Sequence, residues 1–302
     1  MNKFWKSFRT QAPYQIMVWP GIILMAVFNF IPMYGILIAF KDYSVFDTIA
    51  NAEWVGFQYF EEFFSDPNFW KVLKNTVGIS FFKLIIGFPL AIFVAVMINE
   101  LVSPKFKKMV QTVSYLPHFL SWVILGGMFI TWLSDAGLVN NLLRDLNLID
   151  KPIRFLTDSK KYWAIAVISD IWKELGWNTI LYIAAMTGIN PALYEAAKID
   201  GATKMQQIFK ITIPSIRHII ALTFVLSVGG LLGSNLDQTL VLQNPVNYQA
   251  SEVINSYVYK MGIQQGDFSY AAAIGLFVSF FSLILVVVTH LVTRRISDES
   301  VF

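Results

Sequence analysis

Residues 270–292 read YAAAIGLFVSFFSLILVVVTHLV, and this stretch contains no lysine, arginine, aspartate or glutamate. A helix rises about 1.5 Å per residue, so about 20 apolar residues cross the roughly 30 Å hydrocarbon layer of a bilayer. Stretches of similar length and character occur at 17–40, 75–99, 110–133, 162–189 and 218–242. Because helices satisfy their own backbone groups in lipid, the sequence predicts an all-α integral membrane protein with six transmembrane helices.

The amino-acid composition argues against several other classes of protein. Hydrophobic residues make up 56% of the 302 residues and charged residues 14%, with a mean hydropathy of +0.56. A soluble globular chain has about 45–50% hydrophobic and about 25% charged residues. The excess apolar surface of this chain must therefore face a lipid bilayer. This balance excludes a nucleic-acid-binding chain. Cysteine is absent, which excludes disulfide bonds and cysteine-ligated metals. The three histidines are not spaced as a metal-binding pair, so the sequence does not indicate a histidine-ligated metal either.

Positive charge is distributed unevenly between the two sides of the predicted bundle. The N-terminus, the loop after 75–99, the loop 190–217 and the C-terminus carry twelve lysines and arginines, against nine in the alternate loops. With the acidic residues included, the two sides have net charges of +7 and −4. Since loops rich in lysine and arginine stay in the cytoplasm, we predict that both termini are cytoplasmic. We divide the chain into residues 1–74, which comprise a cytoplasmic segment, the first transmembrane helix and an external loop, and a five-helix core, 75–302.

The predicted cytoplasmic loop 190–217 contains a pattern of two short helices. Pro191 is suited to the first turn of a helix, and Gly201 is suited to its C-terminal end. A second short helix runs from there toward Pro214. The first helix carries two consecutive alanines, so a partner protein can approach its backbone closely. We therefore predict a helix–turn–helix that lies on the cytoplasmic face.

The spacing of this loop resembles the EAA loop of bacterial ABC importer permeases. The motif comprises Glu195-Ala-Ala, then Gly201, and finally Ile211-x-Ile213-Pro214, where isoleucine 213 replaces the leucine of the family pattern. Several other segments resemble the carbohydrate branch of this family and, within it, the LplB-like polysaccharide or oligosaccharide permeases. These segments are 31–35, 54–57, 75–76, 111–122, 171–177 and 193–197.

This resemblance implies a type I ABC importer permease (MetI-like) architecture in the bacterial cytoplasmic membrane. It implies an importer of carbohydrate that contains a second, different permease subunit, two ATP-binding subunits and an external solute-binding protein. The short helix of the EAA loop would be the coupling helix that contacts the ATPase. The residues that match this role are Tyr194, Glu195, Ala196, Ala197, Asp200 and Gly201.

The chain itself has no nucleotide-binding motif. The pattern G-x-x-x-x-G-K-[ST], whose backbone cradles phosphates, is absent from the sequence. We therefore expect no cofactor on this chain and no enzymatic activity of its own. ATP and Mg²⁺ are expected on the partner ATPase.

Ionisable residues inside the fourth apolar stretch indicate a polar path, because charges in a membrane span are costly. Asp170, Lys173, Glu174 and Trp177 differ by three, four and seven positions, which places them on one stripe of a helix. Carboxylates, an amine and an aromatic ring together suit a sugar. The alternative is a structural ion pair, between Asp170 and Lys173 or between Lys173 and Glu174, at the interface of two permease subunits.

Two amides extend the predicted path into the fifth apolar stretch. Asn235 and Gln238 are three positions apart, so we expect their side chains to point together toward a substrate. We predict only a structural role, at a kink, for His118, and we assign no role to Lys83.

Two other functions are compatible with parts of the sequence. The first is import of another solute, such as an acidic glycan or a peptide. The second is a membrane-embedded transferase, which needs a carboxylate–metal cluster or a base–nucleophile pair at one interface. The sequence contains no Asp-x-x-Asp and no paired histidines, so a transferase is strongly disfavoured.

Overall fold

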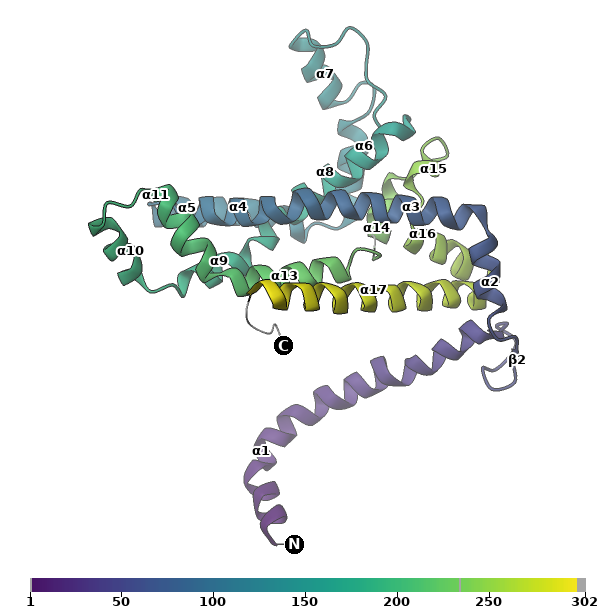
Figure 1. Cartoon of the computed structure of the whole chain (residues 1–302). Helices are drawn as coiled ribbons and strands as arrows, with labels where there is room; N and C mark the ends of the chain where they lie inside the picture. Colours follow the sequence, from purple (N-terminus) through teal and green to yellow (C-terminus); the bar gives the residue numbers. More distant parts are fainter. Residues whose placement is uncertain (1, 234, 298–302) are drawn as a thin grey trace. The chain divides into compact units, whose positions relative to one another are not determined.

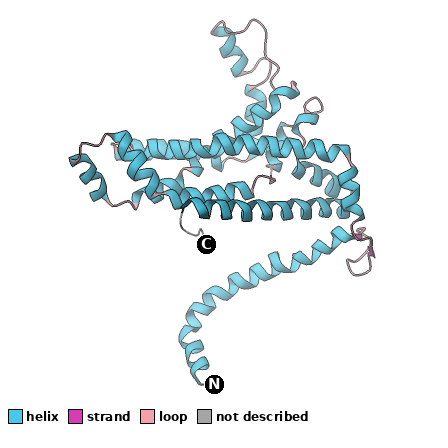
Figure 2. Ribbon diagram, viewed as in Figure 1, coloured by secondary structure: helices cyan, strands magenta, loops and turns pink. Residues whose placement is uncertain are grey.

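The computed structural model describes residues 2–233 and 235–297, and most of them are helical (Figures 1 and 2). The only strands among them are the two-residue segments β1 (Lys41–Asp42) and β2 (Glu53–Trp54), which pair antiparallel. The described residues therefore confirm the predicted all-α class. Their arrangement departs from six continuous helices.

Three helices are long and apolar enough to cross a membrane, at Gln11–Phe40, Pro67–Asn99 and Phe268–Arg294. Two further candidates are bent pairs. Pro104–Phe119 meets Trp122–Trp132 at 97°, and Lys204–Ser215 meets Arg217–Gly229 at 64°. The described residues thus hold three candidate spans, or five if each bent pair crosses once.

Two of the predicted spans differ from expectation. The stretch 162–189 is helical, as α8 (Ser159–Asn178) and α9 (Ile180–Thr187), but five charged residues in α8 exclude it from the candidates. The prediction of one helix over 218–242 is wrong. Helix α13 (Arg217–Gly229) ends at a pair of glycines, which are poor helix formers, and α14 (Leu236–Leu242) begins anew after Asn235.

The contacts within the chain divide it into two compact units, and we describe each by itself. Unit 1 comprises residues 1–65 and 258–277, and unit 2 comprises 66–257 and 278–302. Within residues 1–65, unit 1 contains α1 (Asn2–Met25), the π-helical turn η1 (Ala26–Phe30), the 3₁₀ helix η2 (Ile31–Phe40), the two strands and α2 (Gln58–Ser65). The π-helical turn η6 (Lys260–Gln264) and the start of α17 (Phe268–Ser297) complete it.

A polar and aromatic contact network holds the hairpin of unit 1 to the start of α17. Ser269 donates its hydroxyl to the carbonyl of Lys41 at 2.7 Å and accepts the amide of Tyr43 at 3.0 Å. Tyr59 donates to Asp42 at 2.8 Å. Burial, assisted by this hydrogen bond, raises the pKa of the Tyr59 phenol to about 12, so the phenol stays a donor well into the alkaline range.

Unit 2 contains the remaining helices. In chain order they are α3 (Pro67–Phe82), the π-helical turn η3 (Lys83–Gly87), α4 (Phe88–Asn99), α5 (Pro104–Tyr115), the 3₁₀ turn η4 (Leu116–Phe119), α6 (Trp122–Trp132), α7 (Leu138–Asp145), α8, α9, α10 (Pro191–Ile199), α11 (Lys204–Gln207), the π-helical turn η5 (Ile208–Thr212), α12 (Ile213–Ser215), α13, α14 and α15 (Tyr248–Ser251). Helix α16 (Ile254–Tyr259) follows at the boundary with unit 1.

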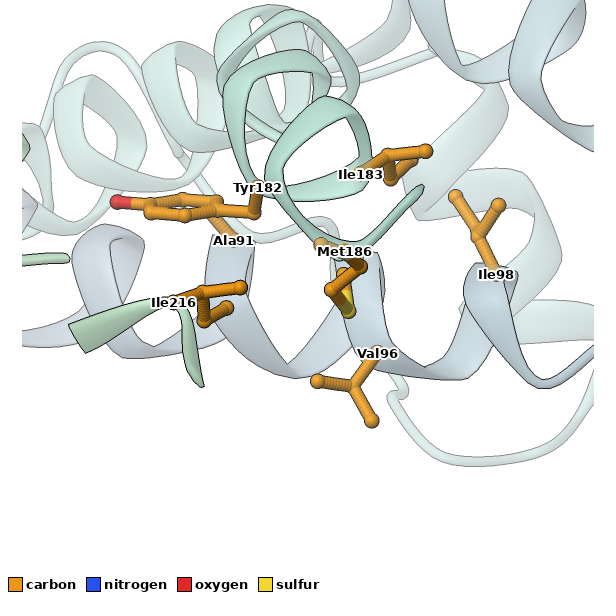
Figure 3. Close-up of a cluster of buried hydrophobic side chains, with 8 residues drawn as sticks. Ala91, Val96, Ile98, Tyr182, Ile183, Met186 and Ile216 are labelled. Atoms are coloured by element: carbon orange, nitrogen blue, oxygen red, sulfur yellow. The ribbon is translucent and has the colours of Figure 1, made fainter. Parts of the chain in front are cut away.

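An apolar cluster packs α4 against α9 in unit 2 (Figure 3). Tyr182, Ile183 and Met186 of α9 meet Ala91 and other residues of α4, and Ile216 adds to the cluster from the turn before α13. Because lipid chains are as apolar as these side chains, close van der Waals packing and not exclusion of water holds the two helices together. The cluster therefore fixes the position of α9, which connects α8 to α10.

Helices α5 and α8 lie close together at Gly176. A Cβ atom built on Gly176 would overlap the backbone carbonyl of Ser114 in α5. Backbone atoms cannot rotate away as a side chain can, so only glycine permits this crossing. The contact holds the C-terminal half of α8 against the segment that precedes the 97° bend.

Replacing Gly176 by alanine is expected to force α5 and α8 apart and to destabilise the protein by about 1–3 kcal/mol, the usual cost of overpacking. Thermal unfolding of the purified membrane complex should show a lower midpoint for Gly176→Ala. Gly127→Ala in α6 is the matched control, because its Cβ would meet nothing within 4 Å. Equal midpoints for the two variants would contradict the proposed close approach.

Candidate functional site

Unit 2 contains a cavity of about 770 Å³ between η3, α8, α9 and α13. Apolar side chains supply much of its wall, and a smaller set of polar and aromatic groups interrupts it. That set includes Lys83, Asp170, Glu174, Trp177, Asn178 and Asn235. A concave, largely apolar site with a few convergent polar groups is typical of small-molecule binding.

Four of the six predicted path residues line this cavity, namely Asp170, Glu174, Trp177 and Asn235. The other two lie behind its wall, because Lys173 is only 6% exposed and Gln238 only 2%. The predicted stripe on α8 therefore divides into a cavity-facing part and a buried part. The expectation that Asn235 and Gln238 point together is wrong. The Asn235 side chain caps α14 by accepting the backbone amide of Gln238 at 3.1 Å, while the Gln238 side chain is buried.

Lys83 is the cavity residue that sequence reasoning did not assign. Its Nζ lies 3.0 Å from Oδ1 of Asp170 and donates to Oε1 of Gln238 at 2.8 Å. Gln238 in turn donates through Nε2 to the carbonyl of Ala166 at 2.7 Å and to Oγ of Ser169 at 2.9 Å. The network joins η3, α8 and α14. The sequence did contain a signal for this pair, because it places a lone lysine in one apolar stretch and an aspartate in another, and charges within membrane spans tend to pair with one another.

Of the two ion pairs named in the alternative interpretation, the one between Lys173 and Glu174 forms and the one between Asp170 and Lys173 does not, while a place at a subunit interface stays a prediction. Nζ of Lys173 donates to Oε1 of Glu174 at 2.9 Å and to the carbonyl of His118 at 2.7 Å. Asp170 pairs with Lys83 instead. Glu174 therefore both lines the cavity and belongs to an ion pair.

His118 occupies the kink predicted for it, in η4 at the 97° bend between α5 and α6. Its Nδ1 lies 2.6 Å from Oε2 of Glu174, and the carboxylate accepts the hydrogen bond. Its ring stacks on the indole of Trp177 with centroids 4.2 Å apart and planes 6° apart. The histidine thus contacts two cavity-lining residues of α8 without lining the cavity.

The predicted helix–turn–helix in loop 190–217 is confirmed. Helix α10 (Pro191–Ile199) is capped by the side chain of Asn190, which accepts the amide of Ala192 at 3.0 Å. The chain turns at Gly201, whose φ of +77° is the left-handed conformation that glycine adopts without strain. The short segments α11, η5 and α12 then lead to α13.

The residues predicted to contact an ATPase lie mostly on the surface of this loop. Glu195, Ala196, Asp200 and Gly201 are exposed, and Tyr194 and Ala197 are half-buried. The Tyr194 hydroxyl lies 2.9 Å from Oγ1 of Thr212, which holds α10 to η5. Two apolar side chains beside them are also exposed, Leu193 at 49% and Ile199 at 87%. Apolar groups next to small residues suit a protein partner better than water.

Comparison with known proteins supports the resemblance seen in the sequence. Residues 87–298 match the family model "Binding-protein-dependent transport system inner membrane component". The chain is 38% identical over 288 residues to the polygalacturonan/rhamnogalacturonan transport system permease protein YteP of Bacillus subtilis, which covers 95% of this chain and 89% of that protein. It is 37% identical over 284 residues to Protein LplB of the same organism, covering 94% and 89%.

Solved structures show the same likeness. A crystal structure of a bacterial ABC transporter involved in the import of the acidic polysaccharide alginate superposes with a TM-score of 0.88 at 38% identity, covering 97% of this chain and 99% of that chain. A second structure of an alginate ABC transporter, bound to a periplasmic protein that carries an alginate pentasaccharide, matches with the same TM-score at 37% identity, covering 98% and 99%. The MetI-like permease fold expected from the sequence is therefore confirmed. The chain belongs to the family of binding-protein-dependent transport system inner membrane components, and is a multi-pass protein of the cell membrane.

Proposed function

We propose that this chain is a permease subunit of an ATP-driven importer of oligosaccharides or polysaccharide fragments. The observation that carries the proposal is its likeness, over nearly the whole length, to a polygalacturonan/rhamnogalacturonan permease and to an alginate importer. The cavity adds chemical support. It combines an indole, which suits the C–H face of a sugar ring, with carboxylate, amine and amide groups, which suit hydroxyls.

The proposed topology has six membrane crossings with both termini in the cytoplasm. The long helices provide three crossings, each bent pair provides one, and α8 with α9 provides the sixth. The charges in the middle of α8, Asp170, Lys173 and Glu174, are compatible with a crossing because they are paired or face the cavity rather than lipid. The match of the family model to 87–298 supports a functional core within 75–302, preceded by residues 1–74.

Partners would complete this importer. A second, different permease subunit would cover the open side of the cavity, two ATP-binding subunits would supply ATP hydrolysis, and an external solute-binding protein would deliver the sugar. ATP and Mg²⁺ would bind to the ATP-binding subunits. Helix α10 would transmit their closure to the permease, through Tyr194, Glu195, Ala196 and Ala197 on the helix and Asp200 and Gly201 at its end. Closure would then switch the cavity between the two sides of the membrane.

The substrate class is tested by uptake into proteoliposomes that contain the complete importer. The liposomes are supplied with the binding protein and with labelled oligosaccharides from pectin and alginate digests, or with a labelled oligopeptide pool. ATP-dependent uptake of oligosaccharide is the expected result. Uptake of peptide alone, or no sugar uptake by a complex that hydrolyses ATP, overturns the proposal.

Substituting Gly201 by valine is expected to uncouple ATP hydrolysis from transport. A β-branched residue is strained at φ +77°, so the turn after α10 would change shape and displace the helix from the ATPase. Gly201→Asn is the matched control, because asparagine tolerates this conformation. The measurement is sugar imported per ATP hydrolysed in proteoliposomes. A Gly201→Val complex as efficient as Gly201→Asn would count against the coupling role.

Removing the indole of Trp177 is expected to reduce uptake about two- to twelvefold, the equivalent of an aromatic contact worth about 0.5–1.5 kcal/mol. Trp172→Ala is the control, because Trp172 lies on the same helix with nearly equal exposure, 43% against 42%, and outside the cavity lining. Copurification of the subunits should be unchanged in both variants. Loss of assembly by Trp177→Ala, or an equal loss of uptake by Trp172→Ala, would assign Trp177 to the scaffold.

A further inference from the structure

The orientation of Trp177 depends on a residue outside the cavity. An indole offers two faces, and a parallel stack with His118 covers one of them. Phe119 meets the indole edge-on, with centroids 5.8 Å apart and planes at 86°. The side chain is nevertheless 42% exposed and lines the cavity. The arrangement leaves indole surface available to a ligand while His118 and Phe119 restrict its rotation.

We propose that His118 is a positioning residue that holds the indole of Trp177 in the orientation in which it receives a sugar ring. The inference rests on the proposed import of sugar. His118 does not touch the cavity, so it acts on the substrate only through Trp177. A positioning role differs from a purely structural role at the bend, because the effect of replacing His118 should then depend on whether Trp177 is present.

Polar contacts from α8 determine where the imidazole lies. Nδ1 of His118 donates to Oε2 of Glu174 at 2.6 Å, while Oε1 of the same carboxylate accepts from Lys173 at 2.9 Å. The Lys173 ammonium also donates to the backbone carbonyl of His118 at 2.7 Å. Both the ring and the backbone of His118 are therefore bound to α8. Since Glu174 and Trp177 lie three positions apart on that helix, the imidazole is held between its carboxylate partner and its stacking partner.

Burial makes this arrangement rigid. Lys173 is 6% exposed, and its ammonium also lies 5.9 Å from the ring centre of Trp122, at the start of α6. Buried charges with several partners hold one geometry, because any rotation would leave a charge unpaired. A preorganised ring loses little rotational freedom when a sugar stacks on it, so less of the contact energy is lost on binding.

The test is a double-mutant cycle in the complete importer, measured as ATP-dependent uptake of sugar from pectin and alginate digests. His118→Ala is expected to lower this uptake about two- to twelvefold, as Trp177→Ala does. The double variant is expected to be no worse than Trp177→Ala alone, because His118 has nothing left to position. A double variant that loses the product of the two single effects overturns the inference, as does His118→Ala with unchanged uptake.

Two further variants keep the inference testable if His118→Ala does not assemble. His118→Phe retains a flat ring for the stack and loses the hydrogen bond, whereas His118→Gln retains a polar group and loses the ring. Uptake is expected to be higher in His118→Phe than in His118→Gln, and the reverse order overturns the inference. Absence of sugar uptake in the unsubstituted complex overturns the proposed function and this inference with it. Uptake by that complex together with an additive cycle overturns the inference alone.

Discussion

Pairing of buried charge is the constraint on which the arrangement of unit 2 depends. An ionised group inside a protein costs several kcal/mol unless a partner and further hydrogen bonds compensate it. Lys83, Asp170 and Gln238 meet this requirement together, and so connect η3, α8 and α14. Lys173 and Glu174 meet it with His118, and connect α8 to the bend between α5 and α6. Lys83, Asp170 and Glu174 of these networks are the charged groups that line the cavity.

Irregular helix geometry occurs at two polar residues of the cavity, Lys83 and Asn235, and at His118, which contacts two others. Lys83 begins a π-helical turn, His118 lies in a 3₁₀ turn at a 97° bend, and Asn235 caps α14 after the break that follows α13. Non-helical backbone at membrane depth is tolerated only where protein or a water-filled cavity surrounds it. The breaks in the helices therefore fit a chain that binds a polar solute inside the bilayer. A bundle without such a cavity would be expected to have regular, continuous helices.

The cavity and the proposed coupling helix are connected by a short, well-packed path. Trp177 lies near the end of α8, α9 follows directly, and α10 begins a few residues later. The apolar cluster between α4 and α9 makes that connection stiff (Figure 3). A force applied to α10 would thus reach the cavity wall through packed side chains and not through a flexible loop. This arrangement supports the proposed coupling between a partner ATPase and the sugar path.

The sequence by itself determined the features that depend on neighbouring residues. Apolar stretches long enough to cross a bilayer, the helix from Pro191 to a turn at Gly201, and the stripe on α8 all follow from local composition and helical periodicity. Only the tertiary structure decided which charges pair and which polar residues face the cavity. Lys83 and Gln238 are 155 positions apart, and Lys173 and His118 are 55 apart. Such contacts depend on how distant helices pack, and no local pattern encodes that packing.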